Sequence, residues 1–188
     1  LAAPPMPPSE PSSSCERVPL SLAAHPAPAV VRAELSAVVQ VGADLWFGAD
    51  EGAGLERLSP DGAGYASHAS FRVGDYVDLP ADDDDEIDVE GLDHADGWLW
   101  VVGSHAGRRR KPDAADDAAD RIDALARVRR RGNRHLLARI PLVRPPDAAS
   151  WEPVREAADG DGAPRVAARL RGGRRANALT RALRHDPH

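Results

Sequence analysis

Between residues 35 and 48 the chain reads Leu35-Ser-Ala-Val-Val-Gln-Val41, then Gly42-Ala-Asp44, then Leu45-Trp-Phe-Gly48. Two runs of β-branched, aliphatic and aromatic residues around a short connection that contains glycine are typical of a β-hairpin. The pattern therefore predicts two antiparallel strands joined by a tight turn at residues 42–44.

Further short strands are expected directly after this hairpin. Residues 54–58 predict a weak strand, and residues 67–73 predict another. Between them, Ser59-Pro-Asp-Gly62 is typical of a turn, because proline presets φ and glycine tolerates positive φ. Four short strands within about forty residues match the size of one β-propeller blade.

The hairpin pattern recurs farther along the chain. The second copy reads Val89-Glu-Gly-Leu-Asp-His-Ala-Asp-Gly-Trp-Leu-Trp-Val101 and aligns without gaps on residues 35–47. We therefore predict a mainly β fold with partial β-propeller-like blades. Trp98 and Trp100 alternate along the second copy, so they share a face of the strand, and we expect that face to be buried.

A single helical insertion is predicted at about residues 113–131. Aspartates crowd its start and arginines its end, which suits the helix dipole, and Gly132 is a natural stop. Ile122 and Leu125 share a face, so we expect the helix to lie over the sheet. The remaining elements expected are a strand over residues 133–143, a strand near 151–154, a loop at 159–164 and a short helix near 177–183.

The chain is expected to divide into a tail and one domain. Residues 1–28 are rich in proline, alanine and serine, which predicts an extended, disordered tail. Residues 29–188 are expected to form an incomplete β-propeller-like domain, because propellers close with four or more blades and two units leave open sheet edges. The chain is therefore expected to be a truncated fragment that needs the remainder of the propeller, carried by the same longer chain.

Composition narrows the classes of partner. The 188 residues include 42% apolar residues but no run long enough to span a membrane, so no membrane partner is expected. The net charge of −6 disfavours general affinity for nucleic acid. Cys15 is the only cysteine, so no cysteine-based zinc site is available. No signal peptide is visible at the N-terminus, and the localisation stays open.

Several segments resemble the DUF3616 family of uncharacterised bacterial proteins. The first is Glu86-Ile-Asp-Val-Glu-Gly-Leu92, followed by Gly97-Trp-Leu-Trp-Val-Val-Gly-Ser-His105. Supporting segments stand in the order of the family: Glu34-Leu-Ser-Ala-Val38, Leu55-Glu-Arg-Leu-Ser-Pro-Asp-Gly62 and Asn133-Arg-His-Leu-Leu-Ala-Arg-Ile-Pro-Leu142. The resemblance implies a β-propeller whose Asp-x-Glu-Gly-Leu element is similar to one in esterase-like, phytase-related propellers. Family members carry a second copy of this element, which is missing here.

The acidic stretch before the second hairpin is the leading candidate site. Asp88 and Glu90 alternate along an expected strand and so point the same way, and Glu86 is placed to join them. Clusters of oxygen ligands suit calcium or magnesium, so Asp88 and Glu90 are predicted as ligands of a divalent cation such as calcium. The alternative is structural, with Glu90 bonding backbone groups where the strand turns at Gly91. Residues 82–85 are expected to form a solvated loop.

Two further features could contact a ligand. His105 is a candidate ligand contact near the end of the sheet, whereas its neighbour Ser104 points to the opposite face and forms no pair with it. The arginine-rich segments 108–111 and 127–131 could bind phosphate. Lys111 is the only lysine among 24 basic residues, a bias that indicates GC-rich coding DNA. Because arginine therefore replaces lysine throughout the chain, a solvated or intramolecular role is favoured for both segments.

Two functions remain open, and so does the question of catalysis. In the first, the chain is a propeller-like protein of unknown function with a non-catalytic or ligand-binding role, its ligand a small molecule or a protein. In the second, it belongs to a metal-assisted phosphoester or ester hydrolase-like propeller in which Asp88 and Glu90 are axial carboxylates.

Overall fold

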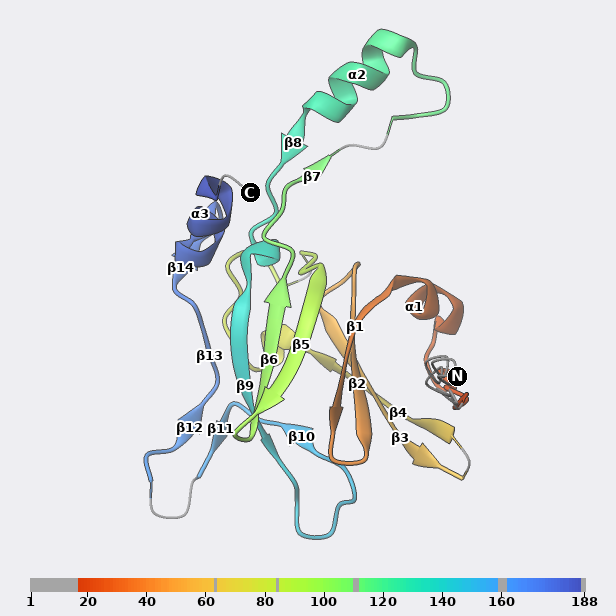
Figure 1. Ribbon diagram of the computed structural model, residues 1–188, viewed down its shortest axis with the longest axis vertical. Helices are drawn as coiled ribbons and strands as arrows, with labels where there is room; N and C mark the ends of the chain where they lie inside the picture. Colours follow the sequence, from red (N-terminus) through yellow and green to blue (C-terminus); the bar gives the residue numbers. More distant parts are fainter. Residues whose placement is uncertain (1–16, 63, 84, 110–111, 159–161, 187–188) are drawn as a thin grey trace, which may run out of the picture.

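A computed structural model describes residues 17–62, 64–83, 85–109, 112–158 and 162–186. Two antiparallel sheets stand next to each other and form most of it (Figure 1). The first sheet contains β1 (Leu35–Val41), β2 (Asp44–Ala49), β3 (Gly54–Asp61) and β4 (Gly64–Arg72), each paired with the next along the chain. With 41% strand and 18% helix, the fold is mainly β, as the sequence predicts.

The second sheet repeats the same up-and-down order. It contains β5 (Val89–Ala95), β6 (Trp98–Gly103), β9 (Leu137–Val143) and β10 (Glu152–Pro153), and β13 (Ala168–Arg169) also pairs with β9. The predicted repeat is confirmed at its two hairpins. The pairing of β1 with β2 is irregular between Leu35 and Ala37, and that of β5 with β6 is irregular at the aligned place, between Val89 and Gly91.

The turn after β3 begins later than predicted. Ser59, Pro60 and Asp61 all belong to β3, and the chain reverses at Gly62, whose φ is 62°. The ladder between β3 and β4 is irregular between Ser59 and Pro60. A proline fits inside a strand at such an irregularity, because it does not need to donate a ladder hydrogen bond there.

The core lies between the two sheets, which meet mainly along β1 and β5. Gly48 of β2 faces Val89 of β5 so closely that a Cβ on this glycine would lie 2.8 Å from Cβ of Val89. The hydroxyl of Ser36 donates a hydrogen bond to the carbonyl of Val89 across the same junction. The buried core residues are Val41, Trp46, Leu55, Val73, Val77, Ile87, Val89, Leu99, Val101, Leu136, Ala138, Ile140 and Leu142.

The expectation that the Trp98 and Trp100 face is the buried one is wrong. Leu99 and Val101 are fully buried and face the first sheet, whereas both tryptophans are half-buried on the opposite face. The guanidinium of Arg139 lies over the ring of Trp98, 4.3 Å from its centroid. The run from Trp98 to Val101 is apolar on both faces, so the alternation alone does not identify the inner one.

The predicted insertion is an arm made of β7 (Arg108–Arg109), α2 (Ala118–Ala126) and β8 (Val128–Arg129). The carboxylate of Asp117 caps α2 by accepting hydrogen bonds from two backbone amides of its first turn. The helix is confirmed, but its expected place over the sheet is wrong. Figure 1 shows the arm projecting beyond the end of both sheets, and Ile122 is 70% exposed.

The segment before β1 covers the outer face of the first sheet. Leu22 and Val31, the latter in α1 (Pro28–Glu34), pack against Phe47 and Leu58. Of the tail predicted over residues 1–28, residues 1–16 lie outside the described part of the chain. None of the helices in the described part is long and apolar enough to cross a membrane.

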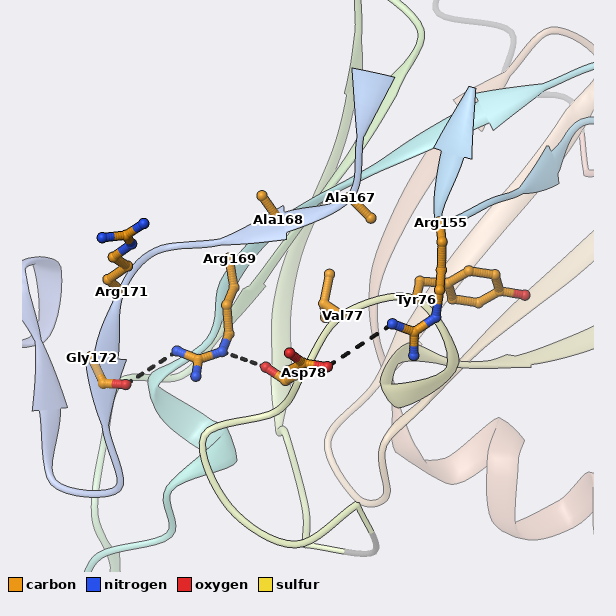
Figure 2. A pocket seen from close by; sticks show the side chains of 9 residues that line it. All are labelled: Tyr76, Val77, Asp78, Arg155, Ala167, Ala168, Arg169, Arg171 and Gly172. Atoms are coloured by element: carbon orange, nitrogen blue, oxygen red, sulfur yellow. Dashed lines mark hydrogen bonds and ion pairs between the residues drawn. The ribbon is translucent and has the colours of Figure 1, made fainter. Parts of the chain in front are cut away.

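The C-terminal segment runs back along the second sheet as short strands and one helix. Arg169 donates to the carbonyl of Asp78 (Figure 2). Arg155 donates from Nε to the carbonyl of Asp75 at 2.6 Å, and the two contacts tie this segment to the loop after β4. The predicted strand near 151–154 and helix near 177–183 are present, and part of the predicted loop, residues 159–161, lies outside the described residues. The remaining elements are η1 (Val73–Asp75), η2 (Asn133–His135), β11 (Glu156–Ala157), β12 (Arg165–Val166), β14 (Gly172–Gly173), β15 (Ala176–Asn177) and α3 (Ala178–His185).

Candidate metal centre

Three carboxylates meet where the first and second sheets adjoin. Asp50 follows β2, Asp88 precedes β5, and Glu90 lies within β5. One oxygen from each lies within 4.8 Å of the others. Asp88 is buried, with 7% of its surface exposed, while Asp50 and Glu90 are exposed. The structure therefore brings the two predicted residues together and adds a third.

Backbone hydrogen bonds hold the two contributing segments in place. The amide of Asp50 donates to the carbonyl of Glu34 at 2.8 Å, and the amide of Ile87 donates to the carbonyl of Gly52 at 2.9 Å. Asp88 has a φ of 58°, a left-handed conformation that aspartate tolerates better than most residues other than glycine. The loop after β2 is thereby fixed against the start of β5.

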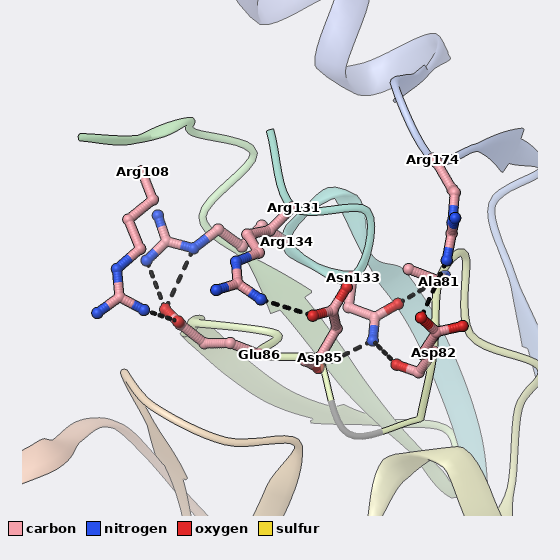
Figure 3. Close-up of polar contacts among 9 residues, drawn as sticks. All are labelled: Ala81, Asp82, Asp85, Glu86, Arg108, Arg131, Asn133, Arg134 and Arg174. Carbon is pink, nitrogen blue, oxygen red and sulfur yellow. Dashed lines mark hydrogen bonds and ion pairs between the residues drawn. The ribbon is translucent and has the colours of Figure 1, made fainter. Parts of the chain in front are cut away.

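Glu86 does not join this cluster, although the sequence placed it as a further member. Its Oε1 accepts from Nη2 of Arg134 at 2.6 Å, and its Oε2 accepts from Nη1 of Arg108 at 2.7 Å, so two guanidinium groups converge on it (Figure 3). Nη2 of Arg134 also lies 2.9 Å from Oδ2 of Asp88. Arg134 therefore offsets part of the negative charge that Asp88 brings into a buried position.

The acidic loop is built around a buried asparagine. Nδ2 of Asn133 donates to the carbonyls of Asp82 and Asp85 at 2.8 and 2.9 Å, and its Oδ1 accepts from the amide of Ala81 (Figure 3). The carboxylate of Asp85 pairs with Arg131 at 2.6 Å. The loop is thus anchored as well as solvated.

The arginine-rich segments on either side of the arm contribute intramolecular ion pairs. Arg108 pairs with Glu86, and Arg131 pairs with Asp85. The favoured intramolecular role is confirmed for these two residues. Positions 110 and 111 of the first segment lie outside the described residues.

His105 lies apart from the carboxylates, against α3. Its Nδ1 is 2.8 Å from Oγ1 of Thr180, and its ring lies 6.3 Å from that of His135. Burial lowers the pKa of both imidazoles, and the positive charge of Arg184 lowers both further. Nε2 of His105 and Nδ1 of His135 have no hydrogen-bond partner among the described residues. The predicted role of His105 as a ligand contact stays a prediction.

Asp50 is the residue that sequence reasoning missed. It stands two residues after the predicted strand at residues 45–48. The strand pattern marks the end of the hairpin but does not show which other segment lies next to that end. Only the stacking of β1 and β2 on β5 brings it to Asp88 and Glu90. The internal repeat predicts two similar hairpins, but it does not predict which of their loops lie next to each other.

The donor set suits a hard divalent cation. Calcium and magnesium prefer oxygen ligands, and calcium in particular tolerates irregular arrangements of carboxylates, carbonyls and water. Asp50 and Glu90 are open to solvent, so water or a ligand oxygen could complete the coordination. The residues present fit such an ion, with Asp88 as the buried ligand and Asp50 and Glu90 as exposed ones.

Comparison with known proteins identifies a family and nothing finer. No curated protein and no solved structure matches the chain. A family model described as a protein of unknown function (DUF3616) matches residues 34–188, a range that includes both sheets and all three carboxylates. The chain therefore belongs to the DUF3616 family.

Proposed function

We propose that this chain contributes propeller-like blades to a non-catalytic, ligand-binding protein, and that Asp50, Asp88 and Glu90 bind a divalent cation such as calcium. The observation that carries the proposal is the convergence of these three side chains, with ligand oxygens within 4.8 Å of one another. Three carboxylates this close repel one another, and a divalent cation between them would remove that repulsion.

The stacking of the sheets supports the propeller-like arrangement. Trp46 and Gly48 of β2 face the second sheet, and the aligned residues of β6 are Trp100 and Val102. These two lie half-buried on the face of the second sheet that points away from the first. A further sheet of the same kind would cover this face as the second sheet covers the first. We therefore propose that the remainder of a propeller packs there.

The first test measures the melting temperature of the chain stripped with EDTA and then supplied with calcium or magnesium. All three proposed ligands lie in β5 or next to the ends of β2 and β5, so the test does not depend on a further sheet. At a free calcium concentration a hundred times the Kd, binding stabilises by about 2.7 kcal/mol, which corresponds to a rise of about 5–10 °C. Glu90→Gln should abolish the rise.

The matched control is Glu156→Gln, which removes an exposed strand carboxylate far along the chain from the cluster. It should melt like the parent chain and keep the calcium response. A calcium response that survives Glu90→Gln, or no response in the parent chain, would contradict the proposed site.

A metal-assisted phosphoester or ester hydrolase is the second candidate. Arg134 pairs with Asp88, and the half-exposed Arg108 pairs with the neighbouring Glu86. Arginines next to a metal can stabilise the charge that develops on a phosphoryl group. Turnover of 4-nitrophenyl phosphate or 4-nitrophenyl acetate that needs calcium or magnesium and is lost in Glu90→Gln would favour it. Calcium binding without turnover of either ester would favour the binding role.

A further inference from the structure

An open pocket of about 360 Å³ lies between the loop after β4 and the C-terminal segment. Arg155, Arg169 and Arg171 line it, and Asp78 is the one carboxylate among its described lining residues (Figure 2). It shares no residue with the carboxylate cluster. The pocket is therefore a separate candidate site with a surplus of positive charge.

Backbone carbonyls, not carboxylates, hold two of these arginines. Arg155 donates from Nε to the carbonyl of Asp75 and from Nη2 to that of Gly74, at 2.6 and 3.2 Å. Arg169 donates from Nε to the carbonyl of Asp78 and from Nη1 to that of Gly172. A carbonyl fixes the orientation of a guanidinium without neutralising it, so both groups are positioned in advance and keep their full charge.

The remaining charges do not balance this pair. Nη1 of Arg155 lies 4.0 Å from Oδ1 of Asp78, the outer limit of an ion pair, and the Asp78 side chain is 95% exposed. Such an exposed, long contact contributes little. Arg171 is exposed and has no hydrogen-bond or ion-pair partner among the described residues. Nη2 of Arg169 and the guanidinium of Arg171 thus remain able to donate to an added anion.

The shape of the pocket favours a small organic anion over a bare ion. Its volume lies within the range of about 300–1,000 Å³ that is usual for small-molecule sites. Val77 and Ala167, which belong to or pack against the core, add an apolar wall next to the arginines. We propose that this pocket binds the phosphate or carboxylate groups of a small organic anion. Neither the family nor the carboxylate cluster assigns such a site.

The experiment titrates the full chain with glycerol 3-phosphate and with citrate by isothermal calorimetry, at constant ionic strength and in EDTA so that no divalent cation contributes. The two probes distinguish a phosphate site from a carboxylate site. We expect saturable binding of at least one probe with one site per chain. Arg171→Gln should weaken it at least ten-fold, because the variant loses a charge-assisted hydrogen bond to the anion.

Two further variants separate this site from general charge effects. Arg144→Gln removes an exposed arginine outside the pocket with the same change in net charge, and should leave the affinity unchanged. Asp78→Asn removes the carboxylate that repels an anion from the pocket, and should strengthen binding by about two- to five-fold because Asp78 is exposed and its effect is weak. Replacing Arg171 breaks no hydrogen bond or ion pair among the described residues, so the circular dichroism spectrum of Arg171→Gln should match that of the parent chain. No saturable binding of either probe, or equal losses in Arg171→Gln and Arg144→Gln, would overturn the proposal.

Discussion

Arg134 pairs with two carboxylates at once: its Nη2 lies 2.9 Å from Oδ2 of Asp88 and donates to Oε1 of Glu86 at 2.6 Å. All three side chains are about nine-tenths buried. A buried carboxylate costs free energy unless it is paired, so this arginine stabilises the segment that positions Asp88.

Replacing Arg134 with glutamine should therefore destabilise the chain and increase its response to calcium. Breaking a buried ion pair costs about 3–5 kcal/mol, and we expect about 3 kcal/mol here because a little solvent reaches the group. Added calcium should restore part of this loss by replacing the missing positive charge next to Asp88. Urea denaturation with and without calcium measures both effects.

Arg131→Gln is the control for that experiment. Arg131 also pairs with a carboxylate, that of Asp85, but its side chain is 39% exposed. Such a pair contributes less than about 1 kcal/mol, so the variant should stay close to the parent chain. If Arg131→Gln and Arg134→Gln lose equal stability, the burial of the Arg134 pair does not make it more stabilising than the exposed Arg131 pair.

The contact between Gly48 and Val89 should tolerate no added methyl group. A Cβ at residue 48 would lie 2.8 Å from Cβ of Val89, so Gly48→Ala should force β2 and β5 apart. Overpacking of this kind costs about 1–3 kcal/mol, measurable by urea denaturation. Because β5 also carries Glu90, the variant should weaken calcium binding as well.

The double variant Gly48→Ala with Val89→Ala tests the cause. Removing the valine side chain makes room for the added methyl, so the two changes together should cost less than the sum of each alone. Gly173→Ala is the control, because a Cβ there meets nothing within 4 Å. Strict additivity in the double variant would show that the two residues do not compete for the same space.

His105 and His135 should make the chain less stable in mild acid. Burial and Arg184 lower the pKa of both imidazoles below the ordinary value of 6.5, so the folded chain takes up their protons only at lower pH than the unfolded chain does. As the pH falls through 6.5, the unfolded state binds protons that the folded state does not, and stability decreases. Above pH 6.5 the two imidazoles are neutral in both the folded and the unfolded chain, so this loss of stability is absent.

Urea midpoints at pH 7.5 and pH 5.5 measure the effect, and we expect a lower midpoint at pH 5.5. His135→Gln should reduce the difference between the two midpoints, whatever it does to stability at pH 7.5. His185→Gln removes an exposed imidazole from α3 and should leave the difference unchanged. If the difference between the two midpoints is the same in His135→Gln as in the parent chain, His135 does not cause the loss of stability in mild acid.

The sequence predicts the parts of this fold that depend on local pattern. β1 has the predicted bounds, and both hairpins appear with the same length and the same irregularity, because turn residues and alternation act within a few positions. Two of the three carboxylates of the proposed site are predicted for the same reason, since Asp88 and Glu90 are close neighbours in one segment. Strands of two residues such as β11 carry too little pattern to be predicted.

What the sequence does not predict depends on how the sheets stack. Asp50 reaches the site only through the junction of β2 with β5, and the inner face of β6 is set by the first sheet. Ile122 and Leu125 share a helix face, yet both are exposed, because the arm carries α2 away from the sheets. In each case the deciding contact joins residues that are distant in the sequence.

The most direct test of the proposed function is calorimetric titration of the EDTA-stripped chain with calcium, comparing the parent with Asp50→Asn. The predicted result is one calcium per parent chain and an affinity at least ten-fold weaker in Asp50→Asn, because the proposed site takes Asp50 as a ligand from a separate loop. Equal calcium affinity in the two chains, or no saturable binding in the parent, would contradict the site built from Asp50, Asp88 and Glu90.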